Sequence, residues 1–123
     1  MTRFVLILTV LAAAPTTREA MKKLNGGPNS LHQTLKLDLK DDDPDWEAIQ
    51  EETAEYVKLT ANLGKNKPPK GDAASWERLT KTYHDDARAL DGAAKRKDRK
   101  GATAALDRLG RACTACHKLH RMD

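Results

Sequence analysis

The chain has 123 residues, 22 of them lysine or arginine and 18 aspartate or glutamate, which gives a formal net charge of +4. This length allows one domain and excludes a multidomain enzyme. Charged residues make up 33% and aromatic residues only 4%, so the apolar core is short of large side chains. Small domains with thin cores usually recruit a metal, a disulfide or a partner, and a large apolar cofactor would serve equally well. Cys113 and Cys116 are too close in sequence for a stabilising disulfide loop.

The N-terminus has the layout of a secretory signal peptide. A short basic start containing Arg3 precedes an apolar run over residues 4–14, which is too short to span a bilayer comfortably. We expect residues 1–14 to be a signal peptide, cleaved within residues 12–15. Residues 15–123 would then form the mature domain of an exported, periplasmic protein without a membrane span. An uncleaved anchor or a buried first helix is the alternative.

The first helix is predicted in two pieces. From Thr16 onward the hydrophobic periodicity is helical, and no stretch shows the sustained alternation of a strand. Thr16 and Glu19 form a capping box that begins a helix over 17–25. Residues 25–28, Asn-Gly-Gly-Pro, interrupt the pattern and separate this helix from a collinear piece over 30–38.

Three further amphipathic stripes follow along the chain. The acidic turn at 41–44 precedes a second helix over 46–63. A loop over 64–71, rich in proline and glycine, leads to a third stripe over 76–90 and a fourth over 102–116. Four such helices joined by modest loops predict an all-α fold, an antiparallel four-helix bundle with the apolar stripes facing inward.

The most informative motif lies near the C-terminus, where residues 113–117 read Cys-Thr-Ala-Cys-His. In a C-x-x-C-H pentapeptide the two thiols can form thioethers with haem, and the adjacent imidazole can bind the iron. We expect Cys113 and Cys116 to attach one haem c and His117 to be an axial iron ligand. The bundle would enclose this apolar macrocycle, which supplies the missing bulk. A dithiol redox pair and a zinc site completed by His120 are the alternatives.

With four helical stripes and a C-terminal C-x-x-C-H motif, the chain resembles the cytochrome c-prime family over about residues 16–121. The resemblance implies a basic residue one turn after the ligating histidine, and Arg121 occupies that place near the haem. It also implies one of two groups, a low-spin group with a first-helix methionine as sixth ligand or a high-spin group with five-coordinate iron. Met21 followed by Lys-Lys resembles the first-helix segment of methionine-ligated members. A gap-filling core role is the alternative for Met21.

The leading hypothesis for function is an exported mono-haem c-type cytochrome that carries single electrons between redox partner proteins. His117 and Met21 would be the axial ligands. The alternative is a five-coordinate, cytochrome c-prime-like binder or sensor of small gases such as nitric oxide or carbon monoxide. We do not expect an enzyme, since we find no distal acid–base pair and no other catalytic constellation in the sequence. The resemblance leaves homodimer formation through an outer face open.

We expect structural roles for the other histidines and for the aromatic side chains. His32, His84 and His120 are expected at the surface or its boundary, and His32 is the substitute ligand if Met21 fails. Four aromatic side chains are expected in the core or against the haem: Trp46, Tyr56, Trp76 and Tyr83.

Charge is distributed unevenly along the chain. Acidic residues concentrate in 38–55 and basic residues in 95–121, which makes the molecule dipolar. Basic residues near a haem edge would steer an acidic redox partner, although two solvated faces that attract each other are the favoured reading. Nucleic acid is not an expected partner, because the basic cluster shares its helix with the haem motif.

Overall fold

A computed structural model describes residues 15–68 and 70–120. These residues form helices and connections without a strand, so the predicted all-α fold is confirmed for the described part of the chain. The signal expected in residues 1–14, and Arg121, lie outside the described residues. The helices are α1 (Thr17–Asn25), α2 (Leu31–Asp38), α3 (Trp46–Leu63), α4 (Ala73–Lys95) and α5 (Arg99–His120).

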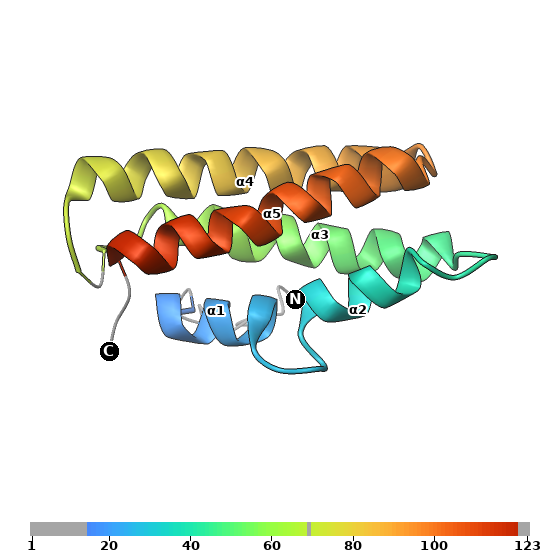
Figure 1. Cartoon of the computed structure of the whole chain (residues 1–123), viewed down its shortest axis with the longest axis horizontal. Helices are drawn as coiled ribbons and strands as arrows, with labels where there is room; N and C mark the ends of the chain where they lie inside the picture. Colours follow the sequence, from blue (N-terminus) through green and yellow to red (C-terminus); the bar gives the residue numbers. More distant parts are fainter. Residues whose placement is uncertain (1–14, 69, 121–123) are drawn as a thin grey trace, which may run out of the picture.

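Three long helices form the frame of the molecule (Figure 1). α4 packs against both α3 and α5, and the short helices α1 and α2 follow one another along α3. α2 also approaches α5 closely. α1 does not: among the described residues, no Cα atom of α1 lies within 8 Å of a Cα atom of α4 or α5. The side chains between α1 and α5 therefore meet across a wider gap than elsewhere in the fold.

The predicted interruption between α1 and α2 is confirmed, and local chemistry explains it. α1 begins at the expected capping box, in which the Thr16 hydroxyl accepts a hydrogen bond from Glu19 N at 3.1 Å. It ends where Gly26 N donates to the Lys22 carbonyl and where Gly27 has a φ of 78°, a left-handed conformation that favours glycine. Ser30 then caps α2. The two pieces lie end to end in Figure 1.

The core is built from the apolar stripes that the sequence predicted. Tyr56 and Tyr83 are buried at its centre, and Leu109 of α5 is fully buried. Small side chains line the contact between α4 and α5, among them Ala87, Ala94, Ala102 and Ala105, which lets these helices pack closely. Burial of one large apolar side chain contributes about 1.5–3 kcal/mol, so these stripes supply most of the stability.

Asn66, in the connection between α3 and α4, ties three segments together. Its Nδ2 donates to the Thr17 hydroxyl at 3.1 Å, and its carbonyl oxygen accepts from Trp76 Nε1 at 2.9 Å. Trp76 in turn meets the His120 ring edge-on, with ring centroids 5.4 Å apart. The start of α1, the start of α4 and the end of α5 are thus joined at one end of the molecule.

Opposite charges meet at the other end. The Arg99 guanidinium donates to the carbonyl oxygens of Asp41 and Asp42, which brings the basic α4–α5 turn against the acidic α2–α3 turn.

Two acidic side chains lie near this end of the molecule. Asp38 of α2 lies beside Glu52 of α3, and one carboxyl oxygen of Glu52 is buried without a hydrogen-bond partner. Burial, and then the Asp38 carboxyl, raise the pKa of Glu52 to about 8.

None of the helices in the described ranges is long and apolar enough to cross a membrane.

Candidate functional site

The C-x-x-C-H residues lie together because α5 continues through the motif. Side chains three and four positions apart share one face of a helix, which groups Cys113, Cys116 and His117. The Cys116 side chain is buried, Cys113 is half-buried and His117 is exposed. Both cysteines are free thiols.

A small cavity lies where this face of α5 meets α1 and α4. Its volume is about 10 Å³, and its lining consists of Met21, Tyr83, Ala112, Cys113, Cys116 and His117. Met21 comes from α1, across the gap where α1 stands away from α5. The four iron-binding and haem-attaching candidates that lie within the described residues are therefore brought to one place.

Burial determines the chemistry of the two thiols. It raises the pKa of Cys113 and of Cys116 above the usual value of a cysteine, so both are protonated near neutral pH. Redox and nucleophilic cysteines instead sit where a positive environment lowers the pKa and favours the thiolate. The surroundings of these cysteines therefore oppose the dithiol redox alternative.

His120 is turned away from the cysteines, which corrects the expectation that it lies at the surface. It is only 3% exposed, with Nε2 3.0 Å from the Ser75 hydroxyl and Nδ1 2.6 Å from the Lys70 carbonyl oxygen. Both ring nitrogens are engaged by α4 and the loop before it, so His120 does not complete a zinc site with the C-x-x-C-H residues. In the described ranges, no three acidic, histidine or cysteine side chains are close enough to share a metal ion.

A row of polar side chains behind the cavity was not predicted from the sequence. His32 Nδ1 lies 3.1 Å from the Tyr56 hydroxyl, which lies 3.1 Å from the Tyr83 hydroxyl. Asn25 Nδ2 donates to the Tyr83 hydroxyl at 3.3 Å and to the Met21 sulfur at 3.8 Å. The apolar stripes placed both tyrosines in the core correctly. The hydrogen bonds of this row depend on how the helices α1 to α4 are rotated relative to one another, for which the sequence carries no signal.

The expected positions of His32 and His84 at the boundary of the core are confirmed. His32 and His84 are half-buried at the boundary of the core, and His84 Nδ1 lies 3.0 Å from the Thr60 hydroxyl. Trp76 is buried with the two tyrosines, and Trp46 packs at the core's edge.

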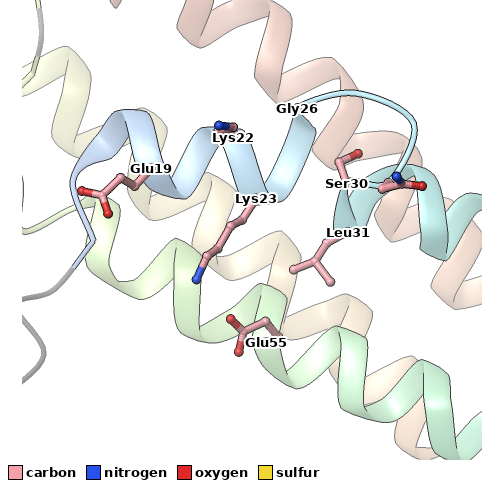
Figure 2. A pocket seen from close by; sticks show the side chains of 8 residues that line it. Glu19, Lys22, Lys23, Gly26, Ser30, Leu31 and Glu55 are labelled. Carbon is pink, nitrogen blue, oxygen red and sulfur yellow. The ribbon is translucent and has the colours of Figure 1, made fainter.

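A second, wider hollow of about 620 Å³ lies between α1, the connection to α2, and α3 (Figure 2). Charged side chains dominate its rim, and Lys23 of α1 and Glu55 of α3 extend toward each other across it. None of the site residues predicted from the sequence lines this hollow. The apolar cavity therefore remains the candidate site.

Comparison with known proteins adds no assignment: no family model matches the chain, and no curated protein or solved structure is significantly similar to it.

Proposed function

We propose that this chain is an exported mono-haem c-type cytochrome of the cytochrome c-prime type. Cys113 and Cys116 would hold one haem c through thioether bonds, and His117 would bind its iron. α1 and α2 together would act as the first helix of an antiparallel four-helix bundle around the haem. The observation that carries the proposal is the convergence of Met21 with the C-x-x-C-H residues on one apolar cavity.

The residues around the cavity fit a haem by their chemistry. The thiols are protonated and face an apolar space, and the exposed His117 imidazole is free to turn toward a ligand. Haem, when bound, supplies a one-electron couple whose potential is set by the axial ligands, nearby hydrogen bonds and burial.

The cavity is far too small for the macrocycle as it stands. Its volume of about 10 Å³ compares with roughly 300–1,000 Å³ for pockets that hold drug-sized ligands. Haem attachment therefore requires α1 to move outward. α1 is suited to this movement because it has only nine residues, is too short to be stable alone, and has no close backbone contact with α4 or α5.

Met21 decides between the two functions. Met21 lines the cavity, and its sulfur accepts a hydrogen bond from Asn25 Nδ2, which orients the thioether. A thioether ligand raises the reduction potential and favours one-electron carriage between redox partner proteins. The second candidate, binding of nitric oxide or carbon monoxide by five-coordinate iron, is supported by the packing of Met21 against the core, which suits an apolar cover.

The test is expression of the chain in a periplasm that carries the haem-attachment machinery. Covalent haem should appear in the mass of the protein, and Cys116→Ser should lose one thioether. If the wild-type protein is exported and folded without covalent haem, the proposal is wrong.

Spectra then separate the two functions. Electron carriage predicts a low-spin spectrum that becomes high-spin in Met21→Ala. Leu24→Ala is the matched control, since it truncates a buried side chain of the same helix that does not line the cavity. A high-spin wild-type spectrum that Met21→Ala leaves unchanged would refute methionine ligation and favour gas binding.

A further inference from the structure

The hydrogen-bonded row behind the cavity connects a histidine on α2 to a haem-attachment cysteine on α5. It runs from His32 through the hydroxyl groups of Tyr56 and Tyr83, with 3.1 Å at each step. At its far end the Tyr83 oxygen accepts hydrogen bonds from Asn25 Nδ2 at 3.3 Å and from the Cys113 thiol at 3.9 Å. The row is buried at its centre, because both tyrosines are almost inaccessible to solvent.

The donors at the far end set the direction of the row. With Cys113 as a free thiol, the Tyr83 oxygen accepts from Asn25 and Cys113, so its own hydrogen points to Tyr56. Tyr56 then donates to Nδ1 of neutral His32, whose hydrogen is on Nε2 in this arrangement. Every donor in the row has an acceptor in this arrangement. Burial lowers the pKa of His32 and raises the pKa of both tyrosines, so these neutral forms are the ones present near pH 7.

When His32 is protonated, the hydrogen bonds of the row must be donated in the opposite direction. Nδ1 of an imidazolium can only donate, so Tyr56 must accept from His32 and pass its own hydrogen toward Tyr83. The Tyr83 hydrogen then needs a new acceptor, and the sulfur of Cys113 lies 3.9 Å away. A thioether at Cys113 has no S–H to donate, so it can only accept.

The charged and titratable groups that face His32 come from three helices. Lys36 on α2 opposes protonation of the imidazole, and Asp107 on α5 favours it. From α3 the facing titratable group is Tyr56, and from α5 the ring also lies against Gly110.

We propose that His32, Tyr56 and Tyr83 form a proton-controlled switch, which decides whether the Tyr83 hydroxyl donates a hydrogen bond to the haem-bearing sulfur of Cys113. The part that concerns haem rests on the proposed function. When His32 takes up one proton from solvent, the hydroxyl groups of Tyr56 and Tyr83 both turn to donate their hydrogen bonds in the opposite direction. No covalent bond other than those to hydrogen changes. Hydrogen bonds near a haem tune its potential, so the switch makes that potential depend on pH.

The decisive variant is Tyr83→Phe, read by an NMR pH titration of His32. Without the Tyr83 oxygen, the reversed Tyr56 hydroxyl has no acceptor, which penalises only the protonated state. An unsatisfied buried donor of this kind predicts that the proton affinity of His32 falls about tenfold, which lowers its pKa by about one.

An unchanged His32 pKa in folded Tyr83→Phe would overturn the switch. This titration reads the polypeptide itself, so its outcome bears on the switch whether or not the chain carries haem. Failure to attach haem refutes the proposed function and the part of the switch that concerns haem, but not the reversal of the hydrogen bonds when His32 is protonated.

A second variant, Tyr56→Phe, covers the case in which Tyr83→Phe does not fold. Tyr56→Phe removes the hydroxyl group that links His32 to Tyr83, but His32 can still take up its charge. The haem potential of the wild type should show a step at the His32 pKa, which Tyr56→Phe and His32→Gln should lose and His84→Gln should retain. The same step in Tyr56→Phe would mean that only the electric field of His32 acts, and the switch would be overturned.

Discussion

Two leucines of equal size offer a sharp test of which surfaces hold the fold together. Leu109 of α5 is 0% exposed, and Leu37 of α2 is 65% exposed. Leu→Ala removes three carbons, worth about 2.4 kcal/mol of transfer free energy when fully buried, and the cavity left in a packed core adds to this cost. We expect Leu109→Ala to lower the free energy of unfolding by about 3–4 kcal/mol. Leu37→Ala should cost less than about 1 kcal/mol, since most of its surface is already in water.

Thermal and urea unfolding of both variants, followed by circular dichroism, measure this difference. For a domain of this length, a difference of about 3 kcal/mol corresponds to a gap in Tm of roughly 10–20 °C. Both substitutions leave the charge and the helix caps unchanged, so the difference between them reports burial alone. Equal Tm values, or a larger loss for Leu37→Ala, would show that α5 does not pack as described.

Two further substitutions probe charge and backbone. In Glu52→Gln the new amide can donate to Asp38. In the wild type the pKa of Glu52 is raised to about 8, so the unfolded chain releases the Glu52 proton at a lower pH than the folded chain does. Wild-type stability therefore falls as the pH rises from about 4.5 to 8. Urea titrations should find the variant more stable at pH 8 and equal to wild type near pH 4.5; a constant difference would contradict this. Gly27→Ala, at φ 78° with open space around it, should cost about 1 kcal/mol from backbone strain alone. The control Gly92→Ala, inside α4, should be neutral or stabilising in the same assay, and equal losses would argue against the strain.

The parts of the fold that depend on local chemistry could be predicted from the sequence. The capping box at Thr16, the break after Asn25 and the start of α3 at Trp46 all follow from residues within one or two turns. α4 begins three residues before its expected stripe because Asp72 caps it, and its first turn carries exposed side chains that leave no hydrophobic pattern.

In the candidate site, too, features within one helix could be predicted and contacts between helices could not. The grouping of Cys113, Cys116 and His117 is a property of one helix, so their spacing predicts it. The position of Met21 opposite them followed from the apolar stripe of α1. His120 and the tyrosine row could not be predicted, because their partners come from other helices and depend on packing between distant segments.

The three-way link at Asn66 has a mechanical consequence for the movement of α1 that the proposed haem attachment requires. Since Asn66 holds the start of α1 by a hydrogen bond, and the glycine turn at Gly27 follows its end, an outward movement of α1 would be a rotation about its first turn. Trp76 hydrogen-bonds to Asn66, so its indole sits at the pivot of that rotation. In a Trp46→Phe variant, where Trp76 is the remaining tryptophan of the sequence, its fluorescence would follow the position of α1 without an added label.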